Sequence, residues 1–520
     1  MPKVMKTPGV YVVEKDAFPS SVVEVATAVP AFIGYTEKHL NGEKSLFRQP
    51  RRITSLTDYE RYFGGPPSLA KSFTIGNKAP KALDDKLTMP VMAGPSDPVV
   101  RQGTAEYYLA RLDTSRRFFM YYGLKSFYQN GGGPCWIVSV GKYASEDGMS
   151  SADFEKGIEA LLKEQEPTML VFPDAVLLSA ADCRTVQEKA VQHCVATQSR
   201  VTILDVYRGY LARDAEGQAD CIEEFRKIAA NEPKYAAAYY PWIDTTVLPE
   251  NDPQLTYAVF DDAGVKVLQA IVTAELVTPE ENAKKKAGYE KLVKDIADPA
   301  ASVGATHSAL RVLSPSYKEI VRQVQSELNR IPPSATMAGI YTQVDNSRGV
   351  WRAPANVGLS GVVSPTVNIS HEEQQDLNVT PTGKSVNAIR TFVGEGTLVW
   401  GARTLDGNSL DWRYVNVRRT MIMLEQSIKL ACKAYVFENN DANTWITIKS
   451  MIRNFLTGIW KRGGLAGTSP DDAFSVHVGL NETMTAEDIL EGILKVTVLV
   501  ALIRPAEFIE ITFQQQMQKS

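Results

Sequence analysis

Residues 200–206 read RVTILDV, a short run rich in apolar and β-branched side chains that contains no glycine or proline. Such a run is typical of a strand buried on both faces of a sheet. Similar runs occur as CWIVSVG at 135–141, TMLVFPD at 168–174 and YAAAYYPW at 235–242. Helical patterns separate them at 151–165, 179–197 and 219–231. This alternation predicts a parallel α/β sheet covered by helices on both faces.

Two stretches depart from this alternation. From Pro66 to about Gly103 the sequence is rich in Pro, Gly, Lys and Ser without periodicity, which favours an insertion or a long surface loop. The stretch 105–129, rich in Tyr and Phe, predicts a helix that ends at the glycine run NGGGP. Further on, Thr278 as N-cap followed by Pro279 predicts the start of a helix over 278–298.

The last third of the chain predicts an α+β domain. Apolar residues recur at helical spacing over 418–437 and over 443–462, and strands are expected at 474–479 and 493–503. The closing stretch 504–520 reads RPAEFIEITFQQQMQKS, in which apolar and polar side chains alternate from Phe508 onward. This period of two predicts a further strand.

The composition is that of an ordinary globular protein. Of 520 residues, 44% are hydrophobic and 22% charged, and the length favours about two to four domains. A formal net charge of −4 argues against a dedicated nucleic-acid binder, which is usually basic. The opening residues lack the apolar core of a signal peptide, and the run ILKVTVLVALI is too short to cross a bilayer. We expect a soluble chain made in the cytosol.

The sequence contains no recognisable metal or cofactor motif. The cysteines are scattered without CxxC spacing, which predicts reduced thiols. His193 and Cys194 are adjacent, but nothing nearby completes a metal site. The glycine runs NGGGP and KRGGLAGTSP match no phosphate-binding loop. We expect neither a metal nor a cofactor.

One stretch invites a catalytic interpretation. PPSATMAGIY at 332–341 faintly resembles the nucleophile loop of subtilisins, but Thr336 stands where the serine belongs. A triad also needs a base and an orienting acid. No HGT-like histidine segment is present, and neither Asp174 nor Asp205 is followed by Ser/Thr-Gly. We expect no catalytic residues, with a degenerate or active subtilisin-like hydrolase as the alternative function.

The helix expected over 443–462 is basic. It carries Lys449, Arg453 and Lys461, and no acid occurs between Ala442 and Pro470, so we expect these charges to lack a local acidic partner. Lys449 and Arg453 are four residues apart and therefore share one side of the helix. This side is either a solvated face or a docking patch for an acidic partner. Nucleic-acid binding through the basic C-terminal helices is a third, less favoured function.

Several long blocks resemble one family. They are TPGVYVVE at 7–14, VATAVPAFIGYT at 25–36, FYQNGGGPCWIVSVG at 127–141, DNSRGVWRAPANVGLSGV at 345–362, RTFVGEGTLVWGARTL at 390–405, WRYVNVRRTMIMLEQSI at 412–428 and RPAEFIEITFQQQ at 504–516. In this order they are similar to the contractile tail sheath proteins of myophages, R-type pyocins and extracellular contractile injection systems. The resemblance covers most of the chain apart from 66–104 and 250–313.

The resemblance implies an α/β plus α+β fold. Its middle domain has a subtilisin-like α/β topology without an active site, and its terminal strands are donated to neighbouring subunits. The implied parts are an N-terminal strand and linker arm (1–20), an N-terminal part of the core (21–104) with the 66–104 insertion, the middle domain (105–345) with the 250–313 insertion, an α+β C-terminal sheath domain (346–503) and a donated C-terminal strand (504–520).

The function that the resemblance implies is structural and not enzymatic. The chain is expected to polymerise as a helical sheath of stacked hexameric rings around an inner tube, and to contract so that the tube is driven through a target cell envelope. The other implied partners are baseplate and terminal cap proteins, without nucleic acid or direct membrane insertion. Synthesis and assembly are expected in the bacterial cytoplasm, and the product is part of a phage tail or of an extracellular phage tail-like particle.

The resemblance also implies two sets of site residues. The intersubunit strands are expected to contain Val10, Tyr11, Val12, Val13, Phe508, Ile509, Ile511 and Phe513. The inner tube is expected to contact the basic helix through Lys449, Arg453 and Lys461. The alternative tube-contacting element is the helix over 418–437, which carries Arg418, Arg419, Lys429 and Lys433.

Overall fold

The computed structural model describes residues 22–78, 89–90, 98–111, 118–143, 148–215 and 217–512. The chain divides into a large unit, Ala26–Arg419 with Pro505–Ser520, and a small unit, Met1–Val25 with Thr420–Arg504. The expected strand residues Val10, Tyr11, Val12, Val13 and Phe513 lie outside the described residues.

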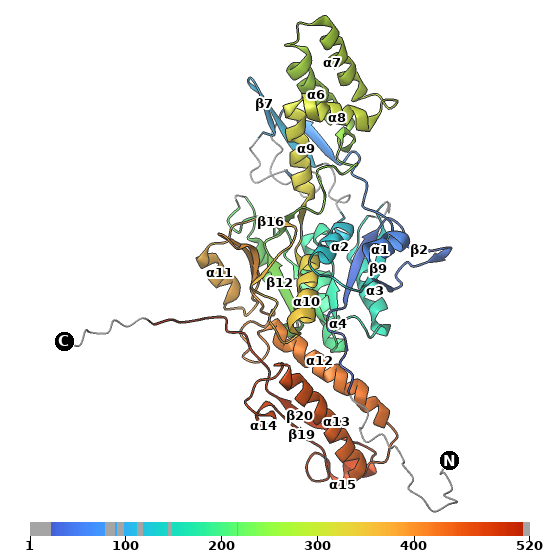
Figure 1. The fold of residues 1–520 in the computed structure, drawn as a ribbon, viewed down its shortest axis with the longest axis vertical. Coiled ribbons are helices and arrows are strands. Elements are labelled where there is room, and N and C mark those ends of the chain that lie inside the picture. Colours follow the sequence, from blue (N-terminus) through green and yellow to red (C-terminus); the bar gives the residue numbers. More distant parts are fainter. Residues whose placement is uncertain are drawn as a thin grey trace, which may run out of the picture. The chain divides into compact units, whose positions relative to one another are not determined.

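A nine-stranded sheet forms the centre of the large unit, in the order β15-β18-β17-β12-β11-β10-β1-β9-β4 (Figure 1). Its strands are β1 (Pro30–Thr36), β4 (Arg51–Ile53), β9 (Cys135–Lys142), β10 (Met169–Val171), β11 (Val201–Asp205), β12 (Ala236–Tyr240), β15 (Val357–Gly358), β17 (Asn387–Phe392) and β18 (Gly396–Trp400). Neighbours from β9 through β1, β10, β11 and β12 to β17 pair in parallel. The predicted parallel strands at 135–141, 168–174, 200–206 and 235–242 are therefore confirmed, with β1 lying between β9 and β10.

Helices cover both faces of this sheet. They are α1 (Leu56–Phe63), α2 (Met120–Gln129), α3 (Ser151–Ala160), α4 (Ala180–Thr197), α5 (Cys221–Arg226), α10 (Ser334–Arg348) and α11 (His371–Asn378). Phe32 of β1 packs against Phe127 of α2 at 5.2 Å between ring centroids, whereas the next residue, Ile33, lies against Gly157 of α3. Because successive side chains of a strand point to opposite faces, α2 and α3 lie on opposite sides of the sheet.

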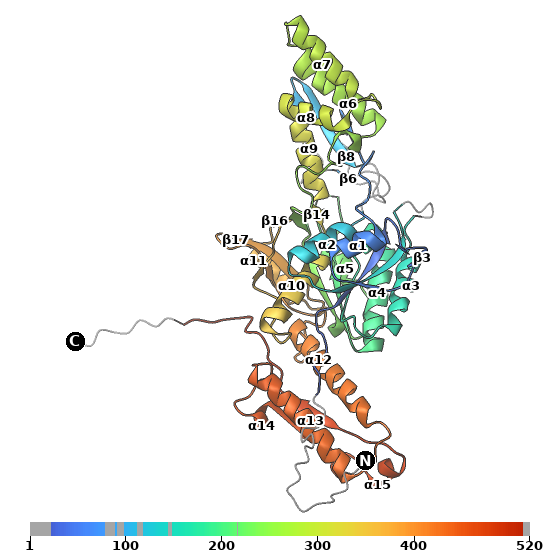
Figure 2. The same cartoon turned by 45° about the vertical axis from the view of Figure 1, so that its right-hand side comes forward.

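The segments expected to be separate insertions form one module (Figures 1 and 2). Its strands are β5 (Phe73–Gly76), β6 (Met89–Pro90), β7 (Val100–Gln102) and β8 (Ala105–Arg111), and its helices are α6 (Asp262–Val272), α7 (Ala283–Asp295), α8 (Val303–Leu313) and α9 (Pro315–Leu328). β5 pairs with β8, and Phe73 of β5 also bridges to Phe260 just before α6. Two predictions are wrong here. Residues 105–111 are a strand because they pair with β5, and α7 begins after Asn282, whose side chain caps it, and not after Thr278.

The remaining strands of the large unit form two small sheets. They are β2 (Leu40–Asn41) with β3 (Lys44–Ser45), and β13 (Ile243–Thr245) with β14 (Arg330–Ile331) and β16 (Val362–Pro365).

The small unit contains helices around one short sheet. α12 (Val415–Cys432) enters it at Thr420, and α13 (Ala442–Lys461), α14 (Pro470–Ala473), β19 (Phe474–His477), α15 (Ala486–Leu490) and β20 (Thr497–Val500) follow. The buried face of α13 contains Ile448, Ile452 and Ile459, which confirms the predicted stripe. β19 and β20 pair antiparallel, and β20 is shorter than the expected strand over 493–503.

Candidate assembly site

The residues that invited a catalytic interpretation have structural partners. Asp174 accepts hydrogen bonds from the N–H groups of Phe119 and Met120 at the start of α2, at 2.6 and 3.2 Å. Asp205 accepts bonds from the N–H and the hydroxyl of Ser334 at the start of α10, at 2.8 and 2.5 Å. Both acids thus satisfy N–H groups that a helix leaves without an internal partner.

Among the described residues, no histidine hydrogen-bonds to Thr336 and could act as a catalytic base. Its hydroxyl lies 2.6 Å from that of Ser126, and the Thr336 side chain is fully buried. Histidine rings bond elsewhere: His193 with Arg200, His307 with Tyr317, and His477 with Glu482. Within the described ranges, no cluster of three His, Cys, Asp or Glu side chains is arranged to hold a metal, and no helix is long and apolar enough to cross a membrane.

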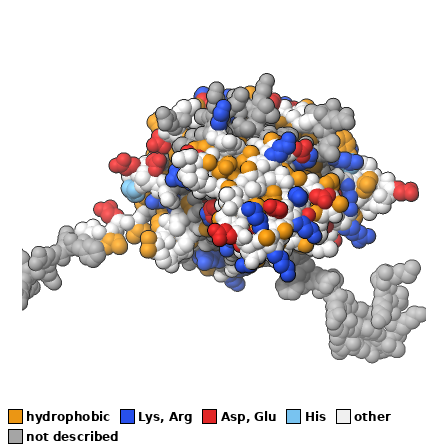
Figure 3. Space-filling model, turned by 90° about the horizontal axis from the view of Figure 1, so that it is seen from above, with side chains coloured by type: hydrophobic (Ala, Val, Ile, Leu, Met, Phe, Trp, Pro, Cys, Tyr) orange, Lys and Arg blue, Asp and Glu red, His pale blue; other side chains and the backbone are white. Residues whose placement is uncertain are grey.

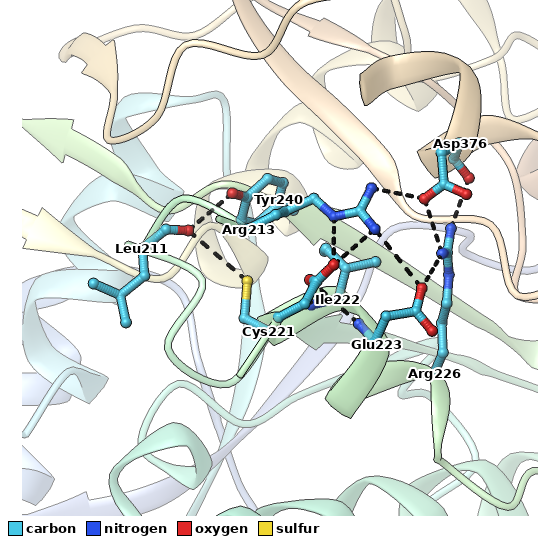
Figure 4. Close-up of polar contacts among 9 residues, drawn as sticks. Leu211, Arg213, Cys221, Ile222, Glu223, Arg226, Tyr240 and Asp376 are labelled. Carbon is cyan, nitrogen blue, oxygen red and sulfur yellow. Dashed lines mark hydrogen bonds and ion pairs between the residues drawn. The ribbon is translucent and has the colours of Figure 1, made fainter. Parts of the chain in front are cut away.

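An ion-pair network joins α5 to α11 (Figure 4). Asp376 of α11 accepts from Arg213 at 2.6 Å and from Arg226 at 2.9 Å. Arg213 also donates to Asp220, the N-cap of α5, at 2.9 Å. Burial raises the pKa of Asp376, but the hydrogen bonds from both arginines outweigh this and hold the pKa below its ordinary value. The network therefore fixes α11 on the large unit.

The C-terminal segment is attached beside this network. The Glu507 carboxylate accepts from Arg403 Nε at 2.9 Å and Nη2 at 2.6 Å, from Asn378 Nδ2 at 2.8 Å and from the Tyr414 hydroxyl at 3.0 Å. Asn378 is the last residue of α11. The sequence offered one signal that we missed. Glu507 is two residues before Ile509 and four before Ile511, so in an alternating strand it belongs to the same face as these apolar residues. A charged residue therefore occupies a position at which the alternation predicts an apolar one.

The N-terminal part of the large unit has a similar attachment. Arg419 forms a bidentate ion pair with Asp345 of α10, at 2.9 and 2.6 Å, and both side chains are almost fully buried. The Thr27 hydroxyl donates to Asp345 at 2.6 Å, and the Thr27 carbonyl accepts from Arg419 at 3.0 Å. These contacts fix the chain three residues before β1 begins.

The basic helix α13 differs from expectation in one respect. Lys449 pairs with Glu482 at 3.6 Å and Arg453 with Asp471 at 3.2 Å, so the expectation that these charges lack a local acid is wrong. Both acids come from beyond Pro470, where folding returns the chain to the helix. Lys461 is exposed, and the described residues place no acid in an ion pair with it.

The alternative helix presents fewer charges than its sequence suggests. Arg418 is buried, with its guanidinium 4.5 Å from the ring centroid of Trp412, and Arg419 is held by Asp345. Lys429 and Lys433 remain exposed.

Figure 3 shows one face of the molecule, seen from above, on which basic and acidic side chains are interspersed. This distribution differs from the single-sign patch of a nucleic-acid binder.

Comparison with known proteins shows what this chain is similar to. Residues 408–516 match the family model described as the phage tail sheath C-terminal domain. The chain is similar to tail sheath proteins. Its sequence is 26% identical to the tail sheath protein of Vibrio phage KVP40 over 157 residues, and 26% identical to that of Enterobacteria phage T4 over 141 residues. These alignments cover 30% and 27% of this chain, and only 23% and 21% of the two phage proteins.

Two solved contractile sheath structures are similar to this chain over almost its whole length. One is the PVC sheath complex of an extracellular contractile injection system in its contracted state, with 26% identity, a TM-score of 0.57 and 99% of both chains covered. The other is the contracted helical sheath of the anti-feeding prophage, with 26% identity, a TM-score of 0.57 and coverage of 99% of this chain and 100% of that one. The mixed α/β fold is therefore that of contractile sheath subunits.

Proposed function

We propose that this chain is the structural subunit of a contractile sheath, which polymerises around an inner tube and contracts to drive that tube through a target cell envelope. The observation that carries the proposal is the similarity to contracted sheath structures over 99% of the chain. The capping roles of Asp174 and Asp205 support a subunit that works through contacts and not through catalysis. Its middle part, expected over 105–345 with an insertion at 250–313, contributes to a subtilisin-like α/β domain in which Thr336 stands where a nucleophilic serine would.

Subunits are linked by donated strands. Phe508, Ile509 and Ile511 are 74%, 80% and 70% exposed, although their alternation is typical of a strand. In the described chain, β19 and β20 pair only with each other, so each has one edge without a strand partner. An added strand forms main-chain hydrogen bonds along such an edge and covers it. Residues 508–515 of one copy, and Val10–Val13 of another, supply these strands to the β19–β20 sheet of a neighbour.

The inner tube contacts the small unit through α13. Lys461 offers an exposed positive charge, and Lys449 and Arg453 lie on the same helix with 36% and 43% of their side chains exposed. An acidic tube surface fits this face, and Lys429 and Lys433 of α12 are the alternative contact. The remaining partners are further copies in stacked hexameric rings, a baseplate and a terminal cap, assembled in the bacterial cytoplasm.

Contraction exchanges one set of intersubunit contacts for another. The large unit moves as a rigid body, while the donated strands keep neighbours connected. Such a transition resembles other bistable packings, in which two arrangements differ in interface contacts and not in chemistry.

The test is electron microscopy of the full chain, expressed alone and together with an inner tube protein. The proposal predicts ribbed tubes alone and extended sheaths on the tube. A chain that stays monomeric in both preparations would refute it. Labelling of the purified chain by a serine-reactive probe would favour the hydrolase alternative, and we expect none.

A further inference from the structure

We propose that Glu507 and Arg403 form a clamp that fixes the point at which the C-terminal segment leaves the large unit. The donated strand then begins at Phe508, and the Glu507–Arg403 ion pair transmits mechanical force from that strand to the large unit. This inference rests on the proposed function, because it assigns a positioning role to a residue next to the strand. It concerns the subunit's own residues, and its first test needs no assembly.

The clamp has the geometry of a strong ion pair. Arg403 Nε and Nη2 approach different oxygens of Glu507, at 2.9 and 2.6 Å, in the parallel arrangement that gives arginine–carboxylate pairs their strength and direction. The third nitrogen, Nη1, donates to the Asn378 carbonyl at 3.0 Å. Only 3% of the Arg403 side chain and 19% of the Glu507 side chain are exposed, so water competes little for these bonds.

Arg403 is itself fixed to the central sheet. Its N–H donates to Asn387 Oδ1 at 2.7 Å, and its carbonyl accepts from Asn387 Nδ2 at 2.8 Å. Asn387 is the first residue of β17, and its amide also donates to the Ala238 carbonyl of β12 at 3.1 Å. A short series of hydrogen bonds therefore runs from two parallel strands of the sheet to Glu507.

The rest of the segment has no comparable attachment. Among the described residues 505–512, Glu507 is the one whose side chain hydrogen-bonds to the remainder of the chain. From Phe508 to Thr512 every residue is exposed. Glu507 is thus the point at which the C-terminal segment changes from a part attached to the large unit to an exposed part. Because the exposed part carries the alternating apolar side chains, the position of the clamp sets the register at which the strand can reach a neighbour.

The clamp can be tested on the monomer with a nitroxide spin label. The label is placed at position 508 through Phe508→Cys, in a chain whose half-buried Cys432 is replaced by Ser while the four buried cysteines are kept. We expect a broadened spectrum in this parent, because residue 508 adjoins the clamp. Glu507→Gln removes the negative charge and should give a sharp spectrum of fast motion. Glu510→Gln makes the same change at an exposed position three residues on, and should leave the spectrum broad.

Equal spectra for Glu507→Gln and the parent would overturn the clamp. Circular dichroism checks that each variant is folded. If Glu507→Gln unfolds the large unit, Tyr414→Phe and Asn378→Ala each remove one bond to Glu507 while the ion pair stays, and the label should gain mobility in both. An unchanged spectrum in both variants would again overturn the proposal.

A second experiment tests whether the clamp strengthens the assembled sheath. Contracted sheaths assembled from the Glu507→Gln chain should break into short pieces severalfold more often than those from Glu510→Gln. If the unmodified chain forms no sheath at all, the proposed function fails while the spin-label result still decides the clamp. If sheaths form and both variants contract intact, the mechanical role is wrong and the function stands.

Discussion

Arg419 and Asp345 form a buried bidentate ion pair that also binds the hydroxyl and the carbonyl of Thr27. Arg419 is the last residue of the large unit before α12 continues into the small unit, and Thr27 is the second residue of the large unit from its N-terminal side. Glu507 is bound by Arg403 close to the third point at which the chain passes between the units. Buried arginine–carboxylate pairs therefore fix the large-unit side of all three connections.

Asp345→Asn should destabilise the large unit strongly. Removing one partner of a buried ion pair leaves the other charge uncompensated, which typically costs about 3–5 kcal/mol. The free energy of unfolding, measured by urea denaturation with a probe in the large unit, should fall by an amount in this range. Glu319→Gln is the matched control, because its pair with Arg322 on α9 is mostly exposed and should contribute less than about 1 kcal/mol. Equal losses for the two variants would contradict this account.

Two truncations should separate the donated strand from the clamp. Removing 508–520 keeps Glu507, so the subunit should unfold at the same temperature as the full chain but form no long tubes. Removing 506–520 also leaves Arg403 without its carboxylate, and should lower the unfolding temperature as well. Calorimetry and electron microscopy of both variants check this. Long tubes from the shorter truncation would show that strand donation by this segment is wrong.

Charge changes on the small unit should act in opposite directions. Lys461→Glu should reduce the fraction of extended sheaths on the tube, most clearly at low salt, because it replaces attraction to an acidic tube by repulsion. Asp471→Asn with Glu482→Gln should increase that fraction, since Arg453 and Lys449 lose their internal partners. Reversing Lys449 and Arg453 is a weaker test, because it also repels these two acids.

Counts of extended, contracted and bare-tube particles at two salt concentrations measure these effects. Lys291→Glu on α7 of the large unit is the control and should change nothing. The same shift for Lys461→Glu and Lys291→Glu would assign the effect to net charge. No shift for any variant would move the tube contact to Lys429 and Lys433.

The large unit should lose stability as the pH rises from about 4 to about 7. Burial raises the pKa of Asp205 to about 7 and that of Asp174 to about 6, although hydrogen bonds from the helix starts favour their charged forms. Between these values and the ordinary value of 3.8, the folded chain holds protons that the unfolded chain releases. Unfolding in this range therefore releases protons, so the stability falls as the pH rises and levels off above the pKa values of the folded chain.

Urea denaturation at about pH 5 and about pH 8 measures this dependence. Asp205→Asn keeps an oxygen acceptor for Ser334 and should flatten it, whereas Asp214→Asn at an exposed position should not. A dependence that is unchanged in Asp205→Asn would mean that this carboxyl stays charged in the folded chain.

The central sheet could be predicted from the sequence, because β9, β10, β11 and β12 are apolar runs and such a composition is typical of buried strands. The prediction failed at 105–111, which the sequence pattern assigns to one helix together with the residues that form α2, because a short apolar run can fit a helix or a strand by periodicity alone. There only the pairing of β8 with β5, a long-range contact, decides between the two. The packing of β5 to β8 with α6 to α9 in one module could not be predicted from the sequence for the same reason.

The candidate site also has features that the sequence predicted and features that only the structure shows. The alternation after Phe508 and the charges of α13 were visible locally. The partners of those charges were not, since Glu482 and Asp471 reach α13 only after the chain has turned back. Glu507 and Arg403 are 104 residues apart, and no local pattern joins them. Sequence periodicity thus identified the elements that we propose contact partners, and the tertiary structure identified the residues that fix them.

Strand exchange between copies is the central claim, and a cryo-electron microscopy reconstruction of tubes formed by the full chain tests it most directly. We predict that the β19–β20 sheet of each subunit carries additional strands, one of which can be traced back to Phe508 and Glu507 of a neighbouring copy. A sheet that remains two-stranded, with residues 508–515 folded onto their own subunit, would contradict the account.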